Sequence, residues 1–123
     1  MNNNNCIFCK IASGEIDSHI INSNDKYISF LDINPSSNGH ALIVPRKHSE
    51  NIFEMNDYEG LKKFIDDTKL ILDKLVKPDG YYIRTNSGSS SGQIIFHTHL
   101  HLVPTYEKET PIKDPSILIK ELK

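Results

Sequence analysis

The sequence predicts an α+β fold: a mainly antiparallel, five-stranded sheet with one long helix and a short C-terminal helix. The chain has 123 residues, 37% of them hydrophobic, which fits a single domain (residues 1–123) with one core. Short β-prone runs dominate, and loops rich in turn-forming residues separate them. One long segment interrupts them with helical periodicity, which is the order of elements typical of an α+β fold.

The composition excludes several classes of protein. The 16 acidic residues nearly balance the 14 basic ones, which excludes a strongly basic nucleic-acid-binding module. No stretch approaches the roughly 18 apolar residues of a membrane span, and the start at Met1 lacks the charged and apolar regions of a secretory signal. We therefore expect a cytoplasmic protein whose partners include neither a nucleic-acid polymer nor a membrane. The Asn run at residues 2–5 is expected to be a frayed end.

Three β-prone runs in the first part of the chain predict strands at residues 18–21, 27–31 and 40–44. Turn-forming residues separate the first two runs, which predicts a hairpin. A loop dense in Asn, Ser, Pro and Gly follows at 32–39, and the third strand is expected to end at Pro45.

The long helix is expected to begin at Asn56, which can cap it together with Glu59 three residues later. It is expected to end by Lys77, because Pro78 disfavours helical geometry in the residue before it. The residues that share one face at helical spacing are Leu61, Phe64, Ile65, Thr68, Ile71, Leu72 and Leu75.

The last third of the chain predicts two more strands and a terminal helix. Residues 80–85 are strand-like, and a run of small residues (Asn86 to Gly92) follows them. A second β-prone run covers 94–103, and residues 111–122 are expected to form a short helix.

The chemistry of the chain is concentrated in the segment His97-Thr98-His99-Leu100-His101. Side chains alternate along a strand, so the three histidines are expected to share one face while Thr98 and Leu100 point to the core. An imidazole of near-neutral pKa can act as a nucleophile or as an acid and base. The simpler alternative is a set of surface histidines or a loose metal-binding tract. The Ser- and Gly-rich turn ahead of the segment can supply backbone N–H groups to an anion, although such loops are usually only loops.

The segment His97–Val103 resembles the His-x-His-x-His-x-x signature of the histidine triad superfamily, and the flanking Gly92, Gln93 and Pro104 are similar to that family as well. Three upstream segments match it in the expected order: Cys6–Ile11, Phe30–Pro35 and Gly39–His48. The nearest branch is that of the small bacterial nucleotide-binding proteins.

The resemblance implies a histidine triad fold and a nucleotidyl hydrolase or transferase that acts on purine nucleotide conjugates. Nucleoside phosphoramidates and dinucleoside polyphosphates are the implied substrates, cleaved at the α-phosphate through a nucleotidyl-histidine intermediate. His99 would be the nucleophile, His101 would bind phosphate oxygens, and His40 would support the site. The implied catalytic residues are His40, His97, His99 and His101, and the implied substrate-binding residues are Asp32, Ile33, Asn86, Gly92 and Gln93.

Two of these substrate assignments have plainer alternatives. Asp32 would hold the ribose hydroxyls, but it could instead be a turn residue before Pro35. Asn86 and Gln93 could equally be loop residues that hydrogen-bond their own backbone.

Cys6 and Cys9 are the only cysteines, and in a reducing compartment their spacing suggests a metal or redox pair. Together with His48 and His97 they match the zinc set of several family members, including the related galactose-1-phosphate uridylyltransferases. The resemblance thus implies a zinc site that is structural, because protein ligands would fill all four positions. The alternatives are two reduced buried thiols, or a thioredoxin-like pair, which is disfavoured because no helix is expected after it.

Two residues depart from the family pattern. Ile94 stands where many relatives carry Ser or Thr, and loss of that hydroxyl could slow phosphoramidate cleavage or shift the preferred leaving group. Thr98 stands where an apolar residue is usual.

Two other functions remain open: a zinc-dependent hydrolase in which the three clustered histidines bind catalytic metal, and a non-catalytic nucleotide-binding or partner-docking module. The resemblance also implies a homodimer formed through the long helix and strand 81–86.

Overall fold

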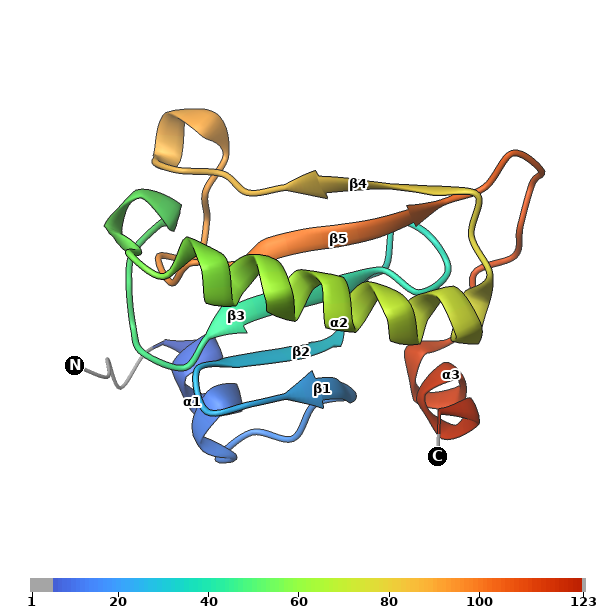
Figure 1. The fold of residues 1–123 in the computed structure, drawn as a ribbon, viewed down its shortest axis with the longest axis horizontal. Coiled ribbons are helices and arrows are strands. Elements are labelled where there is room, and N and C mark those ends of the chain that lie inside the picture. The colour runs from blue at the N-terminus through green and yellow to red at the C-terminus, as the bar shows by residue number, and fades with distance from the viewer. Residues whose placement is uncertain (1–5, 123) are drawn as a thin grey trace.

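The computed structural model describes residues 6–122, so the frayed end expected at residues 2–5 lies outside the described part of the chain. Its five strands form one antiparallel sheet in the order β1-β2-β3-β5-β4, which confirms the predicted α+β class (Figure 1). The strands are β1 (Ile20–Ser23), β2 (Tyr27–Leu31), β3 (Ala41–Pro45), β4 (Gly80–Arg84) and β5 (Leu100–Thr105). The helices are α1 (Ile7–Ser13), α2 (Tyr58–Val76) and α3 (Pro115–Glu121), with 3-10 turns η1 (Ile52–Glu54) and η2 (Ser89–Ser91).

The sheet is covered on both faces, and β3 shows how alternation divides the core. Ala41 and Ile43 point to the face that α2 crosses, whereas Leu42 and Val44 point to the face covered by α1. The buried residues of the α2 side are Ile21, Tyr27, Leu31, Ala41, Ile43, Leu61, Phe64, Leu72, Leu100, Leu102, Leu118 and Ile119. Those of the α1 side are Cys6, Phe8, Cys9, Ile11, Ile28, Phe30, Leu42 and Val44.

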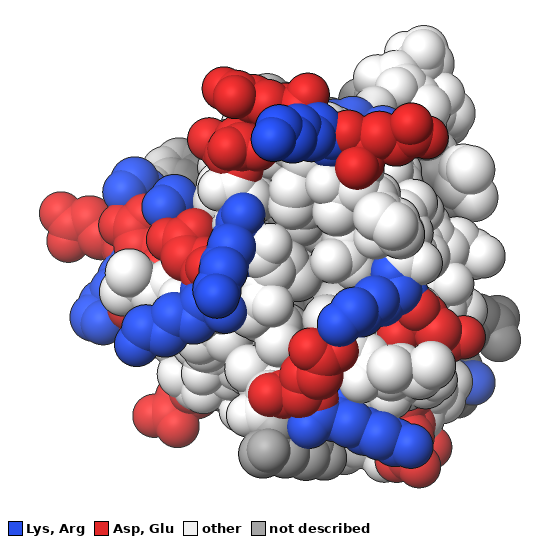
Figure 2. All heavy atoms as spheres, turned by 90° about the vertical axis from the view of Figure 1, so that its right-hand side faces the viewer, with Lys and Arg blue, Asp and Glu red and all other residues white. Residues whose placement is uncertain are grey.

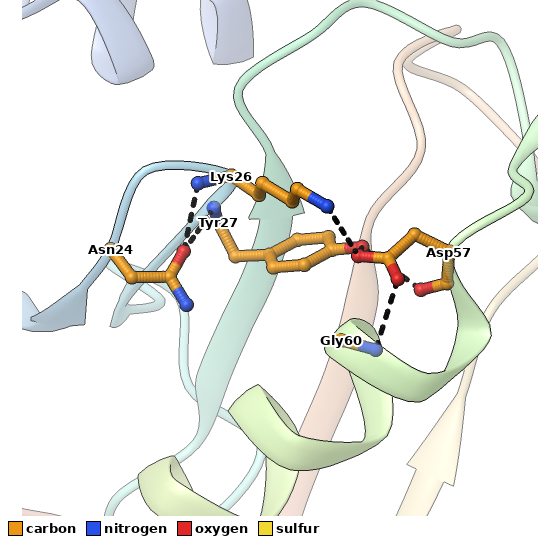
Figure 3. Close-up of polar contacts among 5 residues, drawn as sticks. All are labelled: Asn24, Lys26, Tyr27, Asp57 and Gly60. Carbon is orange, nitrogen blue, oxygen red and sulfur yellow. Dashed lines mark hydrogen bonds and ion pairs between the residues drawn. The ribbon is translucent and has the colours of Figure 1, made fainter.

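The buried face of α2 is the predicted one, but the predicted N-cap is wrong by one residue. Asp57, rather than Asn56, caps the helix, because its carboxylate accepts the Gly60 N–H at 3.2 Å (Figure 3). The same carboxylate accepts the Tyr27 hydroxyl at 3.0 Å and pairs with Lys26. These contacts, led by the Gly60 N–H, hold the pKa of Asp57 below its ordinary value. The cap therefore ties the helix to the β1–β2 turn, where the Asn24 side chain accepts the Tyr27 N–H.

Charged side chains on the surface are mixed in sign. Figure 2 shows Lys and Arg interspersed with Asp and Glu on the face that it presents. Along α2 the charges form i,i+4 pairs, at Lys62–Asp66, Lys63–Asp67 and Lys69–Asp73. No helix in residues 6–122 is long and apolar enough to cross a membrane.

Helix α1 was not expected from the sequence, and the argument that no helix follows Cys6 is wrong. The Cys6 sulfur accepts the Cys9 N–H at 3.2 Å as the N-cap of α1, and Gly14 ends the helix with φ of +86°. Cys6 and Cys9 therefore lie at the start of a helix, so a missing helix is no argument against a thioredoxin-like role.

Strand β5 begins at Leu100 rather than at Ile94 as predicted. β3 pairs with β5 from Ala41 to Ile43, and beyond this the segment 94–99 leaves the sheet. The reason is that its polar groups bond elsewhere: Thr98 N–H donates to the Ser49 carbonyl, and the His97 ring bonds the Pro45 carbonyl.

Candidate functional site

A cavity of about 440 Å³ lies between α1 and the sheet, a size suited to a small-molecule ligand. Asp32, His99 and His101 contribute polar groups to its wall, and the exposed Ile33 stands at its edge. Among the apolar side chains of the wall are Ile7, Phe8, Ile11, Phe30 and Leu42. The cavity therefore combines an apolar surface with a few polar groups of the predicted site.

The three clustered histidines lie on the α1 side of the sheet but have different neighbours. The Phe8 ring lies 4.9 Å from the His99 ring and 6.0 Å from the His97 ring, centroid to centroid. His101 pairs with Leu42 across β3 and β5, and its ring lies 5.5 Å from that of His99. His99 and His101 line the cavity, whereas His97 is fully buried beside the cysteines.

The His99 ring is held so that one nitrogen stays available. Its Nδ1 lies 2.8 Å from the His97 carbonyl oxygen. A carbonyl can only accept a hydrogen bond, so Nδ1 carries the proton of the neutral ring and Nε2 keeps a lone pair. The Thr85 hydroxyl donates to the His99 carbonyl at 2.9 Å and fixes the backbone of the same residue. His99 thus has the form that a nitrogen nucleophile requires.

His101 is the opposite tautomer to His99, with its proton on Nε2, because of a chain of hydrogen bonds. The Ser36 N–H donates to His40 Nδ1 at 2.9 Å, so the neutral His40 ring carries its proton on Nε2. His40 Nε2 lies 2.9 Å from His101 Nδ1 and donates to it. The proton of His101 is then on Nε2, which makes His101 a donor toward an anionic ligand. Asp32 is near this chain, with a carboxylate oxygen 3.6 Å from His40 Nε2.

Burial keeps both rings of this pair neutral. It is the largest cause that lowers the pKa of His101, to about 4, and neighbouring Arg84 and His40 lower it further. Burial also lowers the pKa of His40, although the Asp32 carboxylate opposes the effect. At neutral pH His101 therefore acts as an N–H donor without carrying a charge.

Cys6, Cys9, His48 and His97 form one group, whose ligand atoms all lie within 4.8 Å of one another. His97 Nδ1 lies 3.1 Å from the Cys6 sulfur and 3.3 Å from the Cys9 sulfur, and His48 Nδ1 lies 3.3 Å from the Cys9 sulfur. On the other side of the ring, His97 Nε2 donates to the Pro45 carbonyl at 2.8 Å, which leaves Nδ1 free to bind a metal. Two thiols and two imidazoles at these separations suit a four-coordinate Zn²⁺.

Asp32, His40 and His101 also lie within 4.8 Å of one another, but they suit a metal less well. His40 would have to bind the ion through Nε2 and move its proton to Nδ1, where the Ser36 N–H already donates. Within residues 6–122 the three clustered histidines do not form one ligand group, since His97 joins the cysteines and His101 joins His40. This arrangement argues against a catalytic metal held by all three.

Several predicted substrate-binding residues do not line the cavity. The Gln93 amide is buried and bonds backbone groups of Gly88, Glu50 and Ile95, and the Asn86 amide donates to the Ser91 carbonyl. Both therefore organise the loop around η2, which is the plainer alternative that the sequence left open. Gly92 ends η2 with φ of +101°, and it does not line the cavity either.

Ile94, one of the two residues that depart from the family pattern, points to solvent. Its side chain is 88% exposed and is not part of the cavity wall.

Thr98 has a role that the sequence analysis missed. It is fully buried, its N–H donates to the Ser49 carbonyl at 2.7 Å, and its hydroxyl lies 2.6 Å from the Ser49 hydroxyl. Ser49 follows His48, and Thr98 stands between His97 and His99, so this pair fixes the segment that carries the two histidines. Two features of the sequence could have indicated this role. Thr98 is a polar residue at a position expected to face the core, and Ser49 directly follows the candidate metal ligand His48.

The variant Thr98→Val is expected to lower kcat about tenfold, and to change KM less than about threefold, for any reaction in which His99 is the nucleophile, because it loosens His99 without touching the cavity. Any metal bound by Cys6, Cys9, His48 and His97 should be retained, since the backbone bond from Thr98 to Ser49 remains. Steady-state kinetics and metal analysis would measure both. As a control, Ser49→Ala should have a similar effect, and the double variant should add little to it. An unchanged kcat in Thr98→Val would contradict the positioning role.

Comparisons with known proteins indicate the family of the chain. A family model described as "HIT domain" matches residues 13–108. An uncharacterized HIT-like protein of Saccharolobus solfataricus is 39% identical over 118 residues, which cover 94% of this chain and 85% of that protein. The adenosine 5′-monophosphoramidase of Schizosaccharomyces pombe is 34% identical over 104 residues, 85% of this chain and 77% of that protein.

A comparison with solved structures indicates the same family. The crystal structure of a Hit-like protein from Bartonella henselae superposes with a TM-score of 0.83 at 30% identity, and the match covers 99% of this chain and 97% of that one. Because the family model spans most of the chain and the relatives match nearly all of it, the protein belongs to the histidine triad (HIT) family.

Proposed function

We propose that the protein is a nucleotidyl hydrolase that cleaves purine nucleotide conjugates at the α-phosphate, with nucleoside phosphoramidates as the leading substrate class. One arrangement carries the proposal. His99 Nδ1 contacts the His97 carbonyl, which leaves Nε2 of the neutral ring as an acceptor, and the contact of His101 Nδ1 with His40 leaves His101 Nε2 as a donor on the same cavity wall. The kinship with an adenosine 5′-monophosphoramidase supports the choice of substrate.

In the first step His99 Nε2 attacks the α-phosphorus. The new N–P bond forms while the bond from phosphorus to the amine breaks, and the amine leaves with that electron pair and takes a proton from solvent. The His99 ring then carries a positive charge, which the His97 carbonyl stabilises through the Nδ1–H bond. His101 donates to a phosphate oxygen, whose charge increases in the transition state.

In the second step water attacks phosphorus and the N–P bond breaks. The electron pair returns to His99 Nε2, the nucleotide leaves as a monophosphate, and the proton lost by water goes to solvent. Asp32 binds the ribose hydroxyls, because an ionised carboxylate accepts hydrogen bonds from both. Ile33 and the apolar wall contact the base.

The four-residue group Cys6, Cys9, His48 and His97 is proposed to hold a structural Zn²⁺. Burial raises the pKa of the Cys6 thiol in the metal-free protein, and a bound zinc ion would deprotonate both thiols and join α1 to the segment before β5. All four ligand positions would be filled by protein, so the ion takes no part in the chemical steps.

The decisive experiment is mass spectrometry of the protein quenched during turnover of adenosine 5′-phosphoramidate. We expect one AMP added to the peptide that contains His99. Nucleotide binding without turnover would instead favour a non-catalytic binding module, and turnover with the adduct on another residue would refute the assigned nucleophile.

A homodimer is proposed as well, formed through α2 and β4. β4 is an edge strand, at the top of the sheet in Figure 1, and an unpaired strand edge has to be covered. Ile83 lies opposite Leu102 on the α2 side of the sheet and is 53% exposed, and Leu70 of α2 is 61% exposed. These apolar side chains favour this face as the interface.

The variant Ile83→Glu is expected to convert the dimer, of twice 14.0 kDa, to a monomer, because it places a charge in an apolar contact. Light scattering after size exclusion would measure the mass. Ile20→Glu is the matched control, since Ile20 is 45% exposed on β1 at the opposite edge of the sheet, and this variant should remain dimeric. A wild-type mass of one chain would contradict the proposal.

A further inference from the structure

We infer that the Ser18 hydroxyl reads the edge of the nucleobase and thereby sets base preference. The inference rests on the proposed function, because it assigns a contact within the same nucleotide cavity.

The Ser18 hydroxyl is buried without a hydrogen-bond partner. Its Oγ is the one such side-chain nitrogen or oxygen atom in residues 6–122. Such an atom costs free energy, because it loses water without gaining a protein partner. A protein tolerates this cost where the group serves another purpose, and ligand binding is a common one.

The position of Ser18 indicates which ligand group it meets. Ser18 lines the cavity within the segment that joins α1 to β1. The adjacent His19 carbonyl accepts the Leu31 N–H at 2.9 Å, so the segment runs beside the end of β2. Ile16, two residues earlier, adds to the apolar wall on which a flat base can lie.

In the proposed function the other polar parts of a nucleotide have partners on the cavity wall, Asp32 for the ribose and His99 and His101 for the phosphate. The base offers hydrogen-bond donors and acceptors along its edge, and a serine hydroxyl can both donate and accept. A serine side chain has three staggered rotamers, and the inferred contact requires the one that turns the Ser18 hydroxyl into the cavity.

If the hydroxyl has this role, Ser18→Ala should have opposite effects on the stability of the free protein and on its affinity for the nucleotide. The free protein should keep its Tm or gain up to about 4 °C, because the unpaired buried oxygen is removed. The Kd for the preferred purine monophosphate should rise about 3- to 10-fold, because a hydrogen bond to the base is lost.

Calorimetric titration with AMP, GMP, CMP and UMP, together with thermal unfolding, would test both. We expect the ratios among the four Kd values to change in Ser18→Ala, because a base contact discriminates among bases. Ser23→Ala, an exposed serine of β1 outside the cavity wall, is the matched control and should change neither Kd nor Tm.

Three results would overturn the inference. An equal loss of affinity for all four nucleotides would place the hydroxyl on the ribose or phosphate. A lower Tm of Ser18→Ala would mean that the Ser18 hydroxyl has a hydrogen-bond partner within the protein. Unchanged Kd values would mean that the hydroxyl does not contact the nucleotide. If the wild-type protein binds none of the four nucleotides, the proposed function fails together with the inference, whereas the results above leave the proposed function intact.

Discussion

Replacement of His99 by alanine is expected to lower kcat for adenosine 5′-phosphoramidate by more than about 1,000-fold, while the Kd for AMP changes less than about threefold. In the proposed mechanism the ring supplies the nitrogen that forms the bond to phosphorus, and neither His101 nor His40 is expected to replace it. His101 Nδ1 is occupied by the proton of His40, and its Nε2 carries a proton of its own. Quantification of released AMP would measure the rate, and calorimetry would measure binding.

The same variant separates the candidate mechanisms. His99 lies outside the group of Cys6, Cys9, His48 and His97, so His99→Ala should retain one zinc ion per chain. Loss of zinc with His99 would support a catalytic metal bound by the clustered histidines. Retention of more than about a tenth of the activity would place the nucleophile elsewhere.

Replacement of Cys9 by serine is expected to remove zinc and to lower Tm by about 10 °C or more. The Cys9 sulfur lies 3.3 Å from both His48 Nδ1 and His97 Nδ1, so it contacts both histidines of the ligand group. Structural zinc contributes several kcal/mol to folding, and 1 kcal/mol corresponds to about 4 °C for a chain of this length. Elemental analysis of protein purified without chelator and differential scanning calorimetry would measure the two effects.

A suitable control is Ser13→Ala at the exposed end of α1, where the side chain bonds only the Lys10 carbonyl. It should retain zinc and change Tm by no more than about 4 °C. A wild-type protein that holds no zinc after metal is supplied, or a Cys9→Ser variant as stable as the wild type, would refute the structural metal site.

Local patterns in the sequence determined most of the secondary structure. The apolar face of α2, from Leu61 to Leu75, follows from helical spacing, because residues three and four apart meet on one side of a helix. The strands of the first hairpin follow from β-prone residues around a turn. Helix α1 was missed because it has seven residues, too few for a clear periodic pattern, and because its N-cap is a cysteine rather than a usual capping residue.

The sequence by itself predicted that the three clustered histidines share one face of a single strand, since side chains alternate along a strand. Only His101 lies in β5, whereas His97 and His99 precede it in the segment that leaves the sheet. Only the tertiary structure divided their roles. The Pro45 carbonyl and the cysteines place His97 in a group of candidate metal ligands. The His97 carbonyl fixes the proton of His99, and His40 fixes that of His101. The partners that decide two of these roles lie far away in the chain: 91 residues separate Cys6 from His97, and 61 separate His40 from His101. A protonation state depends on which donor or acceptor reaches each ring nitrogen, and packing, not local sequence, brings those groups together.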